Sequence, residues 1–187
     1  GSQADGVVGE SARATTLNLE CYPIPHILFV SADAWSTTGL SASYQQAALD
    51  ALLYGYDTWE ISDPPNDVPD ADRLLNYDVA LWAQPLTSPG YVGAWDALGA
   101  YLSQGGLLLI SGQDIGYWDV EEGYAKNAYR RYLHAALERS DAGLESVSGL
   151  PGDLFDGLTL QFNTPDSARN QETPDSLAPA DALAAPV

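Results

Sequence analysis

The sequence predicts an α/β fold in which a mainly parallel sheet is doubly wound, with helices on both of its faces. Short continuous apolar runs alternate with stretches of helical periodicity over residues 26–162. Such runs are typical of strands that are covered on both sides. Parallel neighbours also need long crossover connections, and the helical stretches supply them. The 187 residues suffice for one such domain.

The first half of the chain supplies a strand, a helix and a second strand. Residues 1–25 form an extended lead-in that ends in prolines, and residues 26–30 (HILFV) read as a buried strand. Apolar residues recur at helical spacing over residues 43–54, and Gly55 is well placed to end this helix. Residues 56–61 favour a second strand, which precedes an acidic, proline-rich loop.

The second half continues the alternation. Residues 74–75 indicate a short helix, and residues 78–83 (DVALWA) a third strand. A helix follows from Trp95 to Leu102, and Gly105-Gly106 stops it before a fourth strand at 107–110. A further helix is expected over 124–138, with weaker strands at 145–149 and 158–162 and a Pro, Ala and Asp-rich tail or linker over 163–187. This order is flavodoxin-like.

The composition narrows the choice of partners. The formal net charge is −19, from 26 acidic and 7 basic residues, and this charge repels nucleic acid and anionic lipid surfaces. No apolar run approaches the roughly 20 residues of a membrane span.

Cys21 is the single cysteine, so an internal disulfide is excluded. The chain lacks Met and begins Gly1-Ser2, so we expect a fragment of a longer protein.

Polar and aromatic residues gather where the predicted parallel strands end. Ligands of open α/β sheets bind outside the carboxyl ends of the strands. Aromatic side chains at such a rim can stack on sugar rings or hold a peptide, although packing is their default role. The candidate ligand-binding residues are Asp33, Trp35, Gln84, Ser111, Gln113, Asp114, Tyr117 and Trp118.

The turn Gly112-Gln113-Asp114-Ile115-Gly116 has the spacing of a nucleophile turn, with Asp114 at the nucleophile position. Attack by a carboxylate needs an electrophile, a base and donors for the developing charge, and none is specified nearby. An ordinary turn in which Asp114 accepts backbone hydrogen bonds is the favoured interpretation. Hydrolysis of an amide, ester or glycan bond through Asp114 or Ser111 stays an alternative. Ser111 would need His26 or His134 as its base, and both are poorly placed.

Acidic residues near the same turn suggest a second alternative. Asp33, Asp114, Asp119 and Glu121 could supply oxygen ligands to calcium, although their spacing matches no regular calcium loop. A calcium-stabilised structural module is therefore kept open. The sequence contains no phosphate-binding GxxxxGK[ST], no dinucleotide fingerprint after the first strand and no HExxH, so no other cofactor is expected.

Four segments resemble a class I glutamine amidotransferase-like domain, in the version found as an accessory domain of large secreted bacterial proteins such as extracellular peptidases. They are ILFVSAD, YDVALWA, GGLLLISGQDIGY and YRRYLHAAL, within residues 26–162. Enzymes of that superfamily carry a cysteine at the turn, assisted by a histidine and an acid. Asp114 stands at the matching position here, Cys21 precedes the first strand, and no histidine follows His134.

The resemblance therefore implies the fold without the glutaminase or peptidase activity. We expect a non-catalytic accessory or binding domain of a larger secreted bacterial protein, degenerate at the nucleophile turn. Its expected partners are neighbouring domains of the parent protein and, at the strand ends, a glycan or a peptide.

Overall fold

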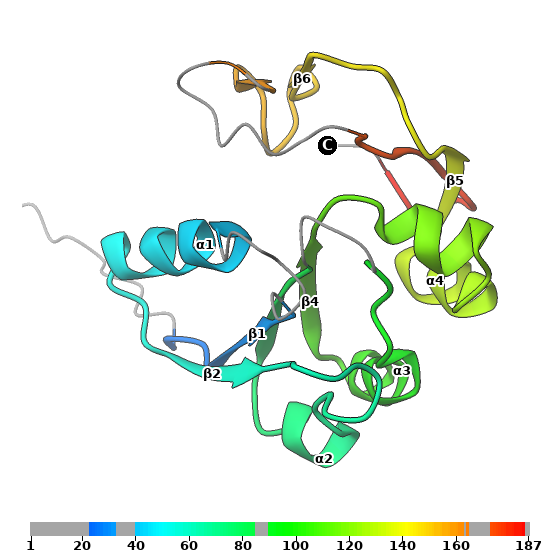
Figure 1. Ribbon diagram of the computed structural model, residues 1–187. Helices are drawn as coiled ribbons and strands as arrows, with labels where there is room; N and C mark the ends of the chain where they lie inside the picture. Colours follow the sequence, from blue (N-terminus) through cyan, green and yellow to red (C-terminus); the bar gives the residue numbers. More distant parts are fainter. Residues whose placement is uncertain (1–22, 33–39, 85–89, 163, 165–172, 186–187) are drawn as a thin grey trace, which may run out of the picture.

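A four-stranded parallel sheet forms the centre of the molecule. The computed structural model describes residues 23–32, 40–84, 90–162, 164 and 173–185, and Figure 1 shows their arrangement. The strand order is β2-β1-β3-β4, and all neighbours are parallel. The predicted parallel α/β sheet is confirmed, with strands β1 (Ile27–Ser31), β2 (Tyr56–Glu60), β3 (Val79–Ala83) and β4 (Leu107–Ser111).

Successive side chains of a strand point to opposite faces of the sheet, and different helices pack on the two faces. In β1, Ile27 and Phe29 pack with Ala42 and Leu49 of α1. The side chains between them point to the opposite face, where Leu28 joins a larger cluster that includes residues of the other helices. The helices are α1 (Leu40–Ala51), α2 (Ala71–Leu74), α3 (Trp95–Ser103) and α4 (Lys126–Leu133), with a π-helical turn η2 (Tyr117–Glu121) before α4.

The central strand β1 is buried along its whole length, whereas β4 is covered on one face only. Leu108 and Ile110 of β4 pack against the larger cluster. Leu107 and Leu109 point the other way and are 63% and 59% exposed. In the described part of the chain, β4 therefore presents an apolar strip on the face that α1 covers elsewhere.

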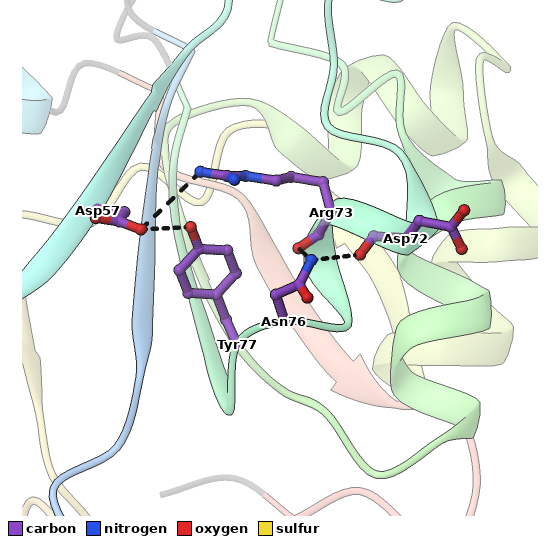
Figure 2. A network of polar contacts seen from close by, with 5 residues as sticks. All are labelled: Asp57, Asp72, Arg73, Asn76 and Tyr77. Carbon is purple, nitrogen blue, oxygen red and sulfur yellow. Dashed lines mark hydrogen bonds and ion pairs between the residues drawn. The ribbon is translucent and has the colours of Figure 1, made fainter.

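A polar network holds α2 against the edge strand β2 (Figure 2). The Tyr77 hydroxyl donates a hydrogen bond of 2.6 Å to Asp57 Oδ2, and an Arg73 guanidinium nitrogen lies 3.9 Å from the same oxygen. Asn76 Nδ2 donates to the carbonyl oxygens of Asp72 and Arg73. The guanidinium of Arg73 also lies over the rings of Tyr77 and Trp59. These contacts position α2 and the turn that follows it.

The expected helix over residues 124–138 is wrong in its second half. Helix α4 ends at Leu133, because His134 adopts the left-handed conformation with φ 51°. Residues Ala135–Arg139 instead form strand β5, which pairs antiparallel with β8 (Ser176–Pro179). A glycine is the usual signal for a left-handed helix end, and a histidine gives no such warning. Residues 163–187, expected as a tail or linker, thus include a strand that the sequence did not reveal.

The two weaker predicted strands are present but lie outside the main sheet. They are β6 (Ser146–Ser148) and β7 (Thr159–Gln161), which pair with each other as an antiparallel hairpin. In Figure 1 this hairpin projects away from the sheet, and every residue of both strands is exposed. Among the described residues, no helix has the length and apolar character needed to cross a membrane.

Candidate functional site

The turn after β4 has the backbone form that its glycines suggest. Asp114 adopts φ 61°, in the left-handed region that non-glycine residues seldom occupy. A Cβ atom at Gly112 would overlap the side chain of Gln84. One at Gly116 would lie 2.8 Å from both Asp175 Oδ2 and Leu137 Cδ1. Close packing against Gln84 therefore requires a glycine at position 112, whereas at position 116 the ends of the Asp175 and Leu137 side chains would have to shift.

The carboxylate of Asp114 is held by the C-terminal part of the chain. The Thr173 hydroxyl lies 3.0 Å from Asp114 Oδ1 and 3.3 Å from Oδ2, and donates its proton to this carboxylate. Gln113 Nε2 donates to Thr173 Oγ1 at 3.1 Å and makes a longer bond of 3.4 Å to Asp114 Oδ2. The side chain at the nucleophile position is thus tied to a residue 59 positions later.

A second residue of the same segment binds the amides that follow the turn. Gly116 N donates to Asp175 Oδ2 at 2.7 Å, and Tyr117 N donates to the same oxygen at 3.4 Å. In enzymes with such turns, the backbone amide of the residue directly after the nucleophile, here Ile115, helps to stabilise an oxyanion, and Gly116 and Tyr117 supply the next two amides. Here a carboxylate of the chain itself already accepts from amides at this helix start.

The environment of Asp175 favours its protonated form. Burial, with smaller contributions from the nearby carboxylates of Asp114 and Glu121, raises the pKa of Asp175 to about 6, against the lowering effect of the Gly116 and Tyr117 amides. Its Oδ1 atom is buried without a hydrogen-bond partner in the described ranges. The turn therefore holds two acidic side chains, Asp114 and Asp175, one bound to a hydroxyl and the other to backbone amides.

The other strand-end candidates lie close to this turn without forming a catalytic set. Gln84 is 1% exposed and packs against Gly112. Ser111 Oγ accepts a hydrogen bond of 2.5 Å from Gln45 Nε2 of α1. His26 directly precedes β1, at the amino end of the strands and so opposite the turn. His134 Nδ1 is 2.8 Å from Asp181 Oδ2. Neither histidine of the chain is placed to serve Ser111 as a base.

The remaining candidates divide into three groups. Asp33 and Trp35 lie outside the described residues. Tyr117 and Trp118 pack edge to face at 5.5 Å in η2. Asp119 is fully buried, whereas Glu121 is exposed. Within residues 23–32, 40–84, 90–162, 164 and 173–185, no three His, Cys, Asp or Glu side chains are grouped as metal ligands.

A cavity of about 750 Å³ opens at the same end of the strands as the turn. It lies between the segments that follow the carboxyl ends of β2, β3 and β4. Its walls are the loop before α2, the first turn of α3 and the first turn of α4. Of the candidates predicted from the sequence, Asp119 is the one that lines it in the described part of the chain. The side chains that line it include Val68, Tyr91, Trp95, Asp119, Tyr124 and Lys126.

Aromatic rings form one side of this cavity. Tyr91 and Tyr124 stack in parallel with their ring centres 4.5 Å apart, and the edge of Trp118 approaches Tyr124 at 5.7 Å. The Tyr91 hydroxyl donates a hydrogen bond of 2.8 Å to the carbonyl oxygen of Pro64, which fixes the ring. Tyr91 follows the third strand and carries no distinguishing sequence pattern, so the sequence did not mark it as a candidate.

Asp119 lies at the floor of the cavity and is completely buried. Its Oδ2 accepts a hydrogen bond of 2.8 Å from the indole nitrogen of Trp95. Its Oδ1 has no hydrogen-bond partner among the described residues. Burial raises the pKa of Asp119 to about 6, against the lowering effects of the Trp95 indole and the Val92 backbone amide. The carboxylate is therefore a buried acid with unused accepting capacity beside an open cavity.

The first turns of α3 and α4 meet this cavity without side-chain caps. The residues at their N-caps are Ala94 and Ala125, and neither offers a side-chain acceptor. The positive ends of both helices therefore face the region of Asp119 and stabilise its negative charge in part. The backbone carbonyl of Asp119 accepts from Ala125 N at 2.9 Å and so also fixes the start of α4.

Comparisons of the chain with protein-family models, curated proteins and solved structures find no match. Function therefore has to be inferred from the contacts of the chain itself.

Proposed function

We propose that this protein is a non-catalytic binding domain whose ligand occupies the cavity beside Asp119. In this proposal it is a doubly wound, flavodoxin-like domain similar to the class I glutamine amidotransferases, and an accessory part of a larger secreted bacterial protein. The observation that carries the proposal is the occupation of the turn by Thr173 and Asp175.

Those two contacts argue against nucleophilic chemistry at the turn. A nucleophile must be free to approach its electrophile, and its oxyanion donors must be free to receive the developing charge. Asp114 accepts from Thr173, and the amides of Gly116 and Tyr117 donate to Asp175. A substrate would have to displace Thr173 from Asp114 before this carboxylate could attack, and it would meet the negative charge of Asp175 beside the turn. The turn serves instead to join the C-terminal segment to the sheet.

The cavity has the features of a small-molecule site. Its volume of about 750 Å³ falls within the roughly 300–1,000 Å³ of typical ligand pockets. Aromatic and apolar side chains line most of it, and one buried carboxylate gives it a polar anchor. That combination provides affinity through apolar contact and orientation through a single polar group.

Exposed apolar surface supports the accessory role. Large apolar side chains outside a core often mark contacts with other domains or proteins. Leu107 and Leu109 form the open strip on β4. The β6–β7 hairpin and its loop add seven further side chains that are at least 40% exposed, namely Leu144, Val147, Leu150, Leu154, Phe155, Leu158 and Leu160. Neighbouring domains of the parent protein are the partners that we propose for these surfaces.

A hydrolase that uses Asp114 is the second candidate. It is favoured by the φ of 61° at Asp114, since a left-handed backbone is what a nucleophile turn imposes on its central residue. Such an enzyme would need Thr173 and Asp175 to act as partners of the nucleophile instead of occupying its place.

A turnover screen separates the two candidates. The protein is incubated with chromogenic amides, esters and glycosides, in parallel with Asp114→Ala and with Glu138→Ala as a matched control at an exposed carboxylate on β5. The binding proposal expects no turnover above buffer in any of the three. Hydrolysis by the wild type and the control that disappears in Asp114→Ala would establish the hydrolase.

A further inference from the structure

We infer that the cavity beside Asp119 selects an organic cation, a protonated amine carried on a flat apolar body. This inference rests on the proposed binding function and names the class of ligand. It depends on three features of the cavity: a buried carboxylate, a wall of aromatic rings and an excess of acidic groups.

The buried carboxylate supplies the polar anchor. Asp119 is 0% exposed, and one of its two oxygen atoms has no hydrogen-bond partner within the described residues. Burying an ionised group without a partner costs several kcal/mol in proteins. The indole donor of Trp95, the backbone amide of Val92 and the uncapped helix ends offset part of that cost. A cation in the cavity would add to this compensation by its electrostatic attraction to the buried carboxylate.

The aromatic wall suits the same charge. The π faces of Tyr and Trp rings carry partial negative charge and attract cations that approach within about 6 Å. The stacked pair of Tyr91 and Tyr124 and the side chain of Trp95 all line the cavity. Apolar residues of the loop before α2, including Pro65 and Val68, lie on the cavity wall as well and would contact the ligand's apolar body.

The balance of charge around the cavity excludes an anion as the preferred ligand. Asp70, Asp96 and Asp119 line it, against the single basic residue Lys126. The whole chain carries a formal charge of −19, which raises the local concentration of cations and repels anions. The positive ends of α3 and α4 act in the opposite sense, but Asp119 already lies beside them.

The affinity for a cation should depend on pH. Burial raises the pKa of Asp119 to about 6. A bound ammonium group stabilises the ionised carboxylate, so binding is strongest where Asp119 is charged and weakens as the pH falls through that value. The other groups that face Asp119 are the indole of Trp95 and the phenol of Tyr129, whose pKa is raised well above its ordinary value and which stays neutral in this range.

Three probes of one shape and different charge test the inference. Phenethylamine, phenethyl alcohol and hydrocinnamate share a phenyl ring and a short chain, and at neutral pH they are a cation, a neutral molecule and an anion. Titration calorimetry on the whole protein is expected to give saturable binding of the amine, at least about tenfold tighter than that of the alcohol. Binding of hydrocinnamate should be weaker still.

Variants locate the effect. Tyr124→Ala, at a ring that is 57% exposed, should weaken amine binding, while Tyr44→Ala, at a similarly exposed tyrosine of α1, should leave it unchanged. Asp119→Asn should remove the preference for the amine over the alcohol. If that variant does not fold, amine and alcohol binding to the wild type are compared with binding to Asp175→Asn. A preference for the amine that falls below about pH 6 in both proteins assigns the effect to Asp119, and one that Asp175→Asn abolishes contradicts the assignment.

Two results would overturn the inference. Equal affinity for the amine and the alcohol, or tighter binding of hydrocinnamate, would show a ligand cavity without cation selectivity and would leave the binding function standing. Absence of binding by all three probes would reject this ligand class, whereas the proposed absence of catalysis is judged separately by the turnover screen.

Discussion

The Thr173 hydroxyl donates to the Asp114 carboxylate across 3.0 Å, and this contact joins the C-terminal segment of the chain to the turn after β4. Two residues later, Asp175 accepts from the amide of Gly116 in the same turn. Together these bonds occupy a potential nucleophile and neighbouring amide donors. The glycine spacing of this turn resembles that of a nucleophile turn in an enzyme. In this protein the turn binds the C-terminal segment of the chain.

Removing the Thr173 hydroxyl tests the strength of that attachment. Thr173→Val keeps the shape of the side chain but leaves Asp114 with an unsatisfied oxygen, so we expect a loss of about 1–3 kcal/mol in the free energy of unfolding. Urea denaturation measures it. Thr159→Val is the control, because its hydroxyl bonds to Ser148 on the exposed hairpin. Equal effects of the two substitutions would contradict the account.

The glycines of the turn offer a second test. Gly112→Ala places a methyl group against the side chain of Gln84, and we expect it to cost on the order of 1–3 kcal/mol through overpacking. Gly55→Ala is a matched control, since a Cβ atom there meets nothing within 4 Å. Thermal or urea unfolding of both variants provides the comparison. A Gly112→Ala protein as stable as the control would show that the turn is not packed as described.

The strands and most of the helices could be predicted from local sequence patterns. The contact of Thr173 with Asp114 could not. Continuous apolar runs marked β1 and β3 because these strands are buried within the sheet. The left-handed residue that ends α4 is His134, and no local rule distinguishes it from a helical histidine. The partner of Asp114 lies 59 residues away. The same three residues, Thr-Pro-Asp, also occur at 164–166, so the sequence alone could not choose between the two segments.

A site was predicted at the carboxyl ends of the strands, but this cavity was not. Parallel strands bring the segments after β2, β3 and β4 to one edge, and a site was expected there. Asp119 was named as a candidate calcium ligand, and the structure shows it buried at the cavity with a hydrogen bond from the indole of Trp95. Its burial depends on how α3 and α4 pack, which is a tertiary property with no signature in the local sequence.

Stability should increase as the pH is lowered from neutral toward about 4. Burial raises the folded-state pKa of both Asp119 and Asp175 from 3.8 to about 6. Between these values the folded protein binds more protons than the unfolded chain, so their contribution is fully present below pH 3.8 and is lost as the pH rises through about 6. Denaturant midpoints measured across this range would reveal it.

The variant Asp119→Asn isolates one of these two groups. It removes the ionisable group while keeping a similar shape, so the pH dependence between about 4 and 6 should become shallower. Glu60→Gln, at an exposed residue of β2, serves as the control and should leave the slope unchanged. A slope that is the same in all three proteins would remove Asp119 from the explanation.

Calcium provides a test of the carboxylates near the turn. Asp114 and Asp175 are engaged by Thr173 and by backbone amides, so we expect calcium to change the melting temperature no more than magnesium at equal concentration. Scanning calorimetry with each ion and with a chelator makes the comparison. A rise specific to calcium, reversed by the chelator, would instead support a calcium-stabilised module, because a ligand of the folded state raises its stability.

The most direct test of the central claim follows the amide proton of Gly116 by hydrogen exchange and NMR. If Asp175 occupies the amides of the turn, this proton is protected in the wild type and loses protection in Asp175→Ala, while the amide of Gly143, which donates to Asp141, exchanges equally in both proteins. An unprotected Gly116 amide in the wild type, or one that Asp175→Ala leaves unchanged, would contradict the claim and reopen the turn as a site of chemistry.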